Sequence, residues 1–196
     1  LLMDIIKVAI ADDHKIFRDG IKMALSYRFD LKIIWEAEDG KDLLHKMTIK
    51  QPDVLLMDIR MPEIDGINAI EMLRKEYDEL KIIVLSMYDD QQMISKMMEM
   101  GANAYLTKTT DPDEIYEAIL TCMNEDFYFN QLVNIAVMGK LMQTKTVRMH
   151  YGNHVSINFS EKEVKILQLL DKVKQTEKIP KLSFLIPQTI DKIPQN

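Results

Sequence analysis

Five short apolar runs that alternate with helical patterns are the feature that most constrains how this chain folds. The runs lie at residues 5–11, 31–37, 53–58, 80–86 and 104–107. Three of them are almost continuously apolar, which is typical of strands covered on both faces. The helical patterns lie at residues 14–28, 39–47, 66–77, 90–100 and 112–123. This alternation predicts an α/β domain in which helices cover both faces of a five-stranded, doubly wound parallel sheet.

Charge is unevenly distributed along the 196 residues. Residues 1–125 contain 15 Lys and Arg and 25 Asp and Glu, for a net charge of −10, whereas residues 126–196 contain 10 and 6, for +4. The shift indicates two parts with different roles, the second facing a polyanion, although a solvated surface also accounts for so modest a positive charge. The alternation of strands and helices stops within the second part. We therefore expect one domain at residues 1–125 and a smaller helical region after it.

The single cysteine, Cys122, excludes an internal disulfide framework and fits a reducing compartment. Its position in a helical pattern predicts a small buried apolar residue rather than a reactive thiol. No run of about 18 apolar residues indicates a membrane span. The first residues carry Asp4 and Lys7 within their apolar stretch, which is not typical of a secretory signal. These features together favour a cytoplasmic protein without a membrane partner.

Polar side chains follow or end four of the predicted strands. Asp12 and Asp13 follow the first, Asp58 ends the third, Ser86 ends the fourth and Lys108 follows the fifth. Open parallel sheets bind ligands outside the carboxyl ends of their strands. Three carboxylates there repel one another unless a cation such as Mg²⁺ neutralises them, and the hydroxyl and ammonium groups suit phosphoryl oxygens. Singly, an Asp-Asp pair is more often a turn or a helix cap. Together, these residues predict a phosphoryl-transfer site with a carboxylate nucleophile.

Four segments, VAIADDH, DVLLMDIRMPEIDG, IIVLSMY and GANAYLTK, resemble the receiver domain of two-component response regulators of the NarL/FixJ/LuxR type. The resemblance covers about residues 5–124. It implies the flavodoxin-like strand order 2-1-3-4-5. It also implies that a sensor histidine kinase phosphorylates Asp58. Asp13, Asp58 and the backbone carbonyl of Arg60 would bind Mg²⁺, and Asp12 would assist through water.

The resemblance also assigns roles to three residues around the phosphoryl group. Lys108 would contact it, Ser86 would move toward it on activation, and Tyr105 would then change rotamer. A half-buried strand aromatic is the plainer interpretation of Tyr105. Slow Mg²⁺-dependent self-phosphorylation and self-dephosphorylation at Asp58 are implied, but the protein is not expected to be a turnover enzyme.

The region after residue 125 predicts a DNA-binding segment that departs from its family pattern. Residues 127–143 are expected to form a further amphipathic helix, so residues 126–155 form a helix and linker. Residues 159–170, FSEKEVKILQLL, resemble the first helix of a helix-turn-helix domain. Within residues 156–196, Thr189 and Lys192 fall where a recognition helix would contact DNA. Pro180 and Pro194 interrupt the helical pattern, so the domain is expected to be atypical or truncated.

Two functions from different classes remain open at this stage. The first is a phosphorylation-switched transcription regulator that binds DNA as a homodimer. The second is a receiver that acts only through phosphorylation-dependent protein–protein contacts. An aspartyl phosphohydrolase is disfavoured because such enzymes typically carry an Asp two residues after the nucleophile, where this chain has Arg60. A P-loop enzyme is disfavoured because the motif GxxxxGK[ST] is absent.

Overall fold

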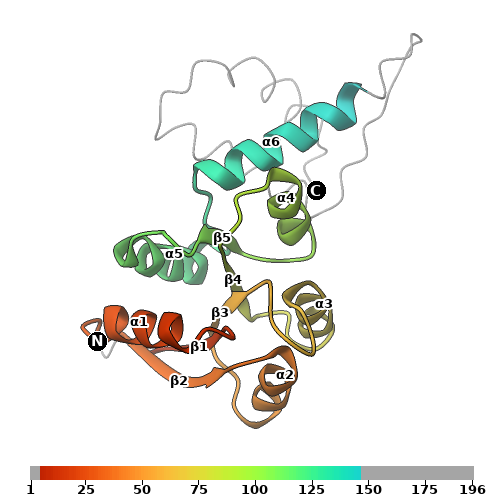
Figure 1. Cartoon of the computed structure of the whole chain (residues 1–196). Coiled ribbons are helices and arrows are strands. Elements are labelled where there is room, and N and C mark those ends of the chain that lie inside the picture. Colours follow the sequence, from red (N-terminus) through yellow and green to blue (C-terminus); the bar gives the residue numbers. More distant parts are fainter. Residues whose placement is uncertain (1–4, 147–196) are drawn as a thin grey trace, which may run out of the picture. The chain divides into compact units, whose positions relative to one another are not determined.

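The structure, a computed structural model, describes residues 5–146, and the side chains of residues 5–140. Five strands and six helices follow one another in this part of the chain (Figure 1). In order they are β1 (Ile6–Ala11), α1 (Lys15–Leu25), β2 (Leu31–Ala37), α2 (Gly40–Ile49), β3 (Val54–Asp58), α3 (Gly66–Glu76), β4 (Lys81–Ser86), α4 (Gln91–Glu99), β5 (Ala104–Thr107), α5 (Pro112–Glu125) and α6 (Gln131–Thr146).

All four strand pairs are parallel, and the sheet has the order β2-β1-β3-β4-β5. The predicted flavodoxin-like order is confirmed. Helices α1 and α5 cover one face of the sheet, and α2, α3 and α4 lie on the other (Figure 1). Strands β3 and β4 have almost no exposed surface because helices cover both of their faces. This arrangement explains why their sequences are continuous apolar runs rather than alternating ones.

Acidic residues start four of the helices and are therefore structural. The side chains of Asp39, Asp65, Asp90 and Asp111 each accept a hydrogen bond from a backbone N–H in the first turn of α2, α3, α4 and α5. Such caps contribute about 1 kcal/mol each. Pro112 occupies the first position of α5, where its missing N–H has no cost. Helix α1 differs, because the side chain of its N-cap residue, His14, makes no capping bond.

In two helices, α1 and α6, some apolar residues are exposed rather than packed on the core. In α1, Ile21 and Leu25 are buried against the sheet, whereas Ile16 and Met23 are exposed. Helix α6 overlaps the expected range of residues 127–143 but begins at Gln131 and ends at Thr146, and the prediction that it is amphipathic is wrong. Apolar residues lie on more than one side of it. Those on one side pack on the domain, because α6 contacts α4 and β5 within the same compact unit, while Ile135 is 44% exposed.

Candidate functional site

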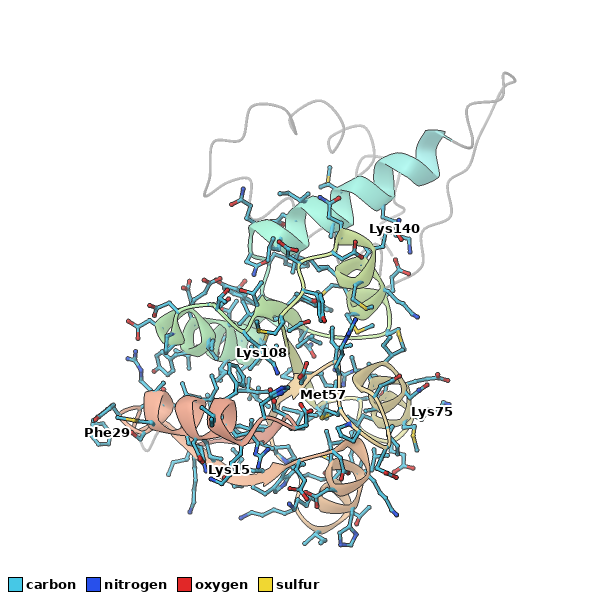
Figure 2. The ribbon with its side chains drawn as sticks, viewed as in Figure 1. Lys15, Phe29, Met57, Lys75, Lys108 and Lys140 are labelled. Carbon is cyan, nitrogen blue, oxygen red and sulfur yellow. The ribbon has the colours of Figure 1, made fainter. Side chains whose placement is uncertain are left out.

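Two carboxylates and one lysine meet at the carboxyl ends of β1, β3 and β5. Asp12 directly follows β1, Asp58 is the last residue of β3, and Lys108 directly follows β5. The Nζ atom of Lys108 lies 2.6 Å from Oδ2 of Asp58 and 2.7 Å from Oδ2 of Asp12. All three side chains are at most 6% exposed. Figure 2 shows Lys108 inside the domain, in contrast to Lys15 and Lys75 at its margin.

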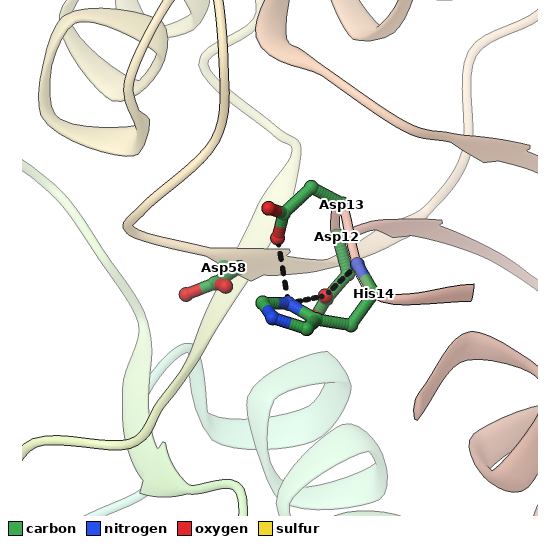
Figure 3. A group of neighbouring side chains, drawn as sticks. All are labelled: Asp12, Asp13, His14 and Asp58. Carbon is green, nitrogen blue, oxygen red and sulfur yellow. Dashed lines mark hydrogen bonds and ion pairs between the residues drawn. The ribbon is translucent and has the colours of Figure 1, made fainter. Parts of the chain in front are cut away.

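Asp13 and His14 complete the group on its solvent side. The Nδ1 atom of His14 lies 2.7 Å from Oδ1 of Asp13 and 3.2 Å from Oδ1 of Asp12 (Figure 3). The backbone N–H of His14 also donates to Oδ1 of Asp12 at 2.8 Å, so the Asp-Asp pair does form a local turn. Sequence reasoning did not single out His14. Its position immediately after two candidate metal ligands was the available signal.

The arrangement fits a divalent metal ion. One ligand atom from each of Asp12, Asp13, His14 and Asp58 lies within 4.8 Å of the other three. Oδ2 of Asp12 is buried and makes no hydrogen bond among the described residues, although the charge of Lys108 is close. Lys108 contacts this oxygen at 2.7 Å, but one ammonium group does not balance three carboxylates, so the remaining negative charge favours a bound cation. Mg²⁺ prefers such oxygens, at distances of about 2.0–2.1 Å. Three carboxylates facing one lysine therefore form a donor set that suits it.

Charge interactions dominate the protonation of Lys108. Burial disfavours its ammonium group, but the short contacts with Asp12 and Asp58 and their negative charges outweigh this effect and raise the pKa of Lys108. The side chain is therefore a fixed positive charge at neutral pH. The ring of Phe17, whose centroid lies 4.9 Å from Nζ, covers this charge.

The loop after Asp58 explains the glycine of the segment DVLLMDIRMPEIDG. The chain turns back so that the N–H of Gly66 donates to the carbonyl of Ile59 at 2.7 Å. A Cβ atom at Gly66 would lie 2.6 Å from the carbonyl oxygen of Asp58, so no side chain fits there. The N–H of Arg60 donates to Oδ1 of Asp58 at 3.2 Å. The loop therefore packs its backbone directly against the carboxylate.

Ser86 and Tyr105 both contact the loop that follows β4. The Oγ atom of Ser86, at the end of β4, accepts a hydrogen bond from the N–H of Tyr88 at 3.2 Å. The hydroxyl of Tyr105, on β5, donates to the carbonyl of Tyr88 at 2.7 Å. Tyr105 is fully buried, so the interpretation as a half-buried aromatic is wrong, and burial raises the pKa of its hydroxyl. The guanidinium of Arg60 lies 4.3 Å from the ring centroid of Tyr88, which links this loop to the one after Asp58.

A family model described as the response regulator receiver domain matches residues 8–120 of this chain. The chain belongs to this family. It is a response regulator of the two-component type, and the motifs that carried the resemblance lie within the matched residues. The receiver fold and the clustering of Asp12, Asp58 and Lys108 agree with this assignment.

Curated and solved relatives of this receiver agree with the family assignment. Response regulator protein VraR of Staphylococcus saprophyticus is 29% identical over 185 residues, covering 94% of this chain and 85% of VraR. The receiver domain of NarL from Mycobacterium tuberculosis is 31% identical, with a TM-score of 0.59, and the match covers 62% of this chain and 98% of that one. The isolated receiver domain of RcsB from Salmonella enterica serovar Typhimurium, solved with the phosphomimetic BeF₃⁻, is 25% identical. Its TM-score is 0.63, and the match covers 68% of this chain and 99% of that one.

Helix α6 covers the side of the receiver formed by α4 and β5. Val133 is fully buried there, and the Oγ of Ser95 on α4 donates to the carbonyl of Ala136 at 3.0 Å. The side-chain amide of Asn130, which precedes α6, donates to the carbonyl of Tyr105 at 3.0 Å. The start of α6 is therefore bonded to the strand residue whose hydroxyl reaches Tyr88.

The structure places the predicted site residues in two groups, and two further residues lie outside the described part of the chain. Asp12, Asp13, Asp58 and Lys108 come together, while Ser86 and Tyr105 meet at Tyr88. Cys122 is fully buried, and burial raises the pKa of its thiol to about 12, as the apolar interpretation requires. Thr189 and Lys192 lie outside the described residues. Within residues 5–146 no helix is long and apolar enough to span a membrane.

Proposed function

We propose that Asp58 is the phosphoacceptor of this response regulator and that a sensor histidine kinase is its phosphoryl donor. The observation that carries the proposal is the position of Asp58. Its carboxylate is almost fully buried at the end of a central strand, 2.6 Å from the ammonium of Lys108 and close to the carboxylates of Asp12 and Asp13. This position fixes the carboxylate for attack on a phosphorus atom. The ammonium of Lys108 is already in place to stabilise the charge.

The reaction forms one bond and breaks one. A carboxylate oxygen of Asp58 forms a bond to phosphorus, and the bond between phosphorus and the donor nitrogen breaks. The leaving imidazole keeps the electron pair and takes a proton from solvent. Before the reaction, the ammonium of Lys108 donates a hydrogen bond to Asp58. During the transfer it would stabilise the negative charge on the phosphoryl oxygens. Mg²⁺ held by Asp13, Asp58 and the carbonyl of Arg60, with Asp12 assisting through water, would neutralise phosphoryl oxygens. Self-phosphorylation from small donors and slow self-dephosphorylation belong to the same proposal.

The switch follows from the contacts at Tyr88. A phosphoryl group on Asp58 adds negative charge and acceptor oxygens at the ends of the strands. The hydroxyl of Ser86 would turn from the N–H of Tyr88 toward that group. The loop then loses one of its hydrogen bonds, and the bond from Tyr105 to the carbonyl of Tyr88 must adjust with it. Tyr105 is joined to the start of α6 through Asn130, so the change reaches the helix that leads to the C-terminal part.

The proposed output is control of transcription by DNA binding as a homodimer in the cytoplasm. Residues 126–196 carry a net charge of +4, opposite in sign to the receiver. The match with VraR covers 94% of this chain, including the C-terminal part. RcsB has been solved bound to promoter DNA and as dimers on DNA. Thr189 and Lys192 are the proposed contacts in the recognition segment.

The first test is the intact mass of the full chain before and after incubation with Mg²⁺ and a small phosphodonor. We expect the mass of one phosphoryl group in the parent and none in Asp58→Asn. A Glu71→Gln variant, which changes an exposed carboxylate on α3, serves as the matched control and should gain the group normally. An equal gain in parent and Asp58→Asn would assign the phosphoryl group to another residue and end the proposal.

A second test separates DNA binding from the alternative of protein–protein contacts alone. Phosphorylated and unphosphorylated chain are titrated onto DNA of mixed sequence in a mobility-shift assay at two salt concentrations. Binding through backbone phosphates weakens steeply as salt rises. A salt-dependent shift that Lys192→Ala weakens supports DNA binding. No shift at either concentration favours a receiver that acts through protein contacts.

A further inference from the structure

We infer that His14 is a metal-specificity residue of the receiver site, supplying a nitrogen ligand that favours Co²⁺- and Zn²⁺-type ions over Mg²⁺. The inference deepens the proposed function and rests on the same carboxylates as its metal site. The geometric starting point is that a ligand atom of His14 shares one 4.8 Å cluster with those of Asp12, Asp13 and Asp58. His14 is the one nitrogen ligand of this cluster.

The contacts of His14 show how it reaches the site. Its Nδ1 lies 2.7 Å from Oδ1 of Asp13 and 3.2 Å from Oδ1 of Asp12, so the ring is held against two carboxylates (Figure 3). The side chain is 68% exposed, and its small ring therefore has room to turn toward a metal without displacing core residues. Its backbone is fixed, because the N–H of His14 donates to Asp12.

A second observation points to a ligand at this place. Oδ2 of Asp12 is buried and makes no hydrogen bond among the described residues, and Asp12 as a whole is 1% exposed. Nζ of Lys108 contacts this oxygen at 2.7 Å, and a metal ion would bind its second lone pair. Asp12 therefore offers a coordination position on the buried side of the cluster, and His14 offers one on the solvent side.

The chemistry of the ligand set then decides which ion benefits. Carboxylates, carbonyls and water suit Mg²⁺, whereas an imidazole nitrogen adds affinity for Co²⁺, Ni²⁺ and Zn²⁺. For Mg²⁺ the imidazole contributes nothing and competes for the same carboxylate oxygens. A transition-metal ion can use His14 together with the carboxylates and fills positions that Mg²⁺ leaves to water and phosphoryl oxygens. Such an ion would exclude Mg²⁺ and suppress phosphorylation of Asp58.

The test measures metal affinity directly in the full chain. Titration calorimetry with Co²⁺ alone and with Mg²⁺ alone, at one fixed pH, gives the ratio of the two dissociation constants. The visible absorption of bound Co²⁺ reports nitrogen ligation independently. Parent, His14→Ala and His14→Asn are compared with His45→Ala, which removes an exposed histidine from α2. We expect the preference for Co²⁺ to fall about tenfold or more in both His14 variants and to stay unchanged in His45→Ala.

The opposite result is equally clear. A preference that changes less than twofold in the His14 variants, with an unchanged Co²⁺ spectrum, overturns the inference. Phosphorylation is scored separately by intact mass with Mg²⁺, with and without added Co²⁺. Loss of phosphate gain in the parent under Co²⁺, relieved by His14→Ala, supports the inference. A chain that never gains phosphate but shows the His14-dependent preference refutes the proposed function and leaves the inference standing.

Discussion

Each end of the sheet contains a partly or fully buried cation, and the pKa of that cation shifts in opposite directions at the two ends. At the carboxyl end, Lys108 contacts the carboxylates of Asp12 and Asp58, which raise its pKa against the effect of burial. At the amino end, Arg74 on α3 donates to neutral oxygens, and burial lowers its pKa. Its acceptors are the carbonyls of Gly101, Tyr77 and Leu80 and the side chain of Asn103, at 2.7–3.1 Å.

The two ends differ in whether their buried polar groups are balanced by hydrogen-bond partners and opposite charges. Asn103 continues the amino-end network, accepting from the N–H of Ile82 and donating to the carbonyl of Asp126, so it joins the starts of β4 and β5 to the end of α5. At the carboxyl end, Lys108 contacts the carboxylates of Asp12 and Asp58, and the third carboxylate, Asp13, lies beside His14. The satisfied end stabilises the fold, and the excess of carboxylates at the other end is compatible with binding a metal ion. Removing a charge should therefore change stability in opposite directions at the two ends.

Arg74→Ala should show the largest effect. The substitution removes four hydrogen bonds, three of them to backbone carbonyls, and we expect the free energy of unfolding to fall by about 3–4 kcal/mol. Urea denaturation followed by circular dichroism measures the change. Lys75→Ala is the matched control, because among the described residues Lys75 forms one ion pair, with the exposed Glu71, and its loss should change stability by less than about 0.5 kcal/mol. A loss below about 1 kcal/mol in Arg74→Ala would remove the basis of the comparison.

Alkaline pH should weaken the amino end. Cys122 lies there, with its thiol 3.7 Å from the carbonyl of Asn103, and burial raises its pKa from 9.0 to about 12. The folded state therefore binds this proton more tightly than the unfolded state. The stabilisation is complete below pH 9 and disappears as the pH rises toward 12, with about 1 kcal/mol lost by pH 10.

Urea denaturation at several pH values, with Cys122→Ala beside the parent, isolates this contribution from other titrating groups. Tyr128, whose pKa burial also raises to about 12, is present in both proteins. The difference between the two proteins should shrink from pH 8 to pH 10 by the stated amount. A difference that does not depend on pH would mean that Cys122 does not titrate as its burial requires.

Asp58→Asn should raise stability at the carboxyl end. The substitution removes one of three carboxylates and leaves Lys108 paired with Asp12, so we expect about 1 kcal/mol of stabilisation in EDTA. Mg²⁺ should reduce the difference in unfolding free energy between the variant and the parent, because the parent binds Mg²⁺ more tightly. Thermal and urea unfolding with and without Mg²⁺ provide the measurement. Destabilisation in EDTA would show that the pair of Asp58 with Lys108 outweighs the repulsion.

Tyr105→Phe should have the smallest effect on stability. It deletes the hydrogen bond to the carbonyl of Tyr88 while keeping the buried ring, and we expect a loss of about 0.5–1 kcal/mol. Hydrogen exchange should localise the change to the loop after β4 and to the start of α6, which Asn130 joins to Tyr105. Faster exchange confined to the amino end of the sheet would contradict the proposed connection from Tyr88 through Tyr105 to α6.

Much of the fold followed from local sequence patterns. All five strands were predicted to within one residue at either end, because strands covered on both faces must be apolar throughout. The grouping of Asp12, Asp58 and Lys108 followed from the rule that parallel strands place their carboxyl ends at one edge. The amphipathic character predicted for α6 was wrong, because residues 127–143 contain apolar residues on several sides and periodicity does not identify which side a neighbour covers.

The sequence by itself therefore determined the fold class, the strand order through its family motifs, and the grouping of Asp12, Asp58 and Lys108 at the carboxyl edge of the sheet. Tertiary structure alone decided how charges and hydrogen bonds are shared: His14 against Asp13, Tyr88 between Ser86 and Tyr105, and Arg74 with Asn103 at the far end. The physical reason is how much of the fold each interaction depends on. Apolar periodicity arises from neighbours a few residues apart, whereas these contacts join side chains whose distance depends on the packing of the whole sheet.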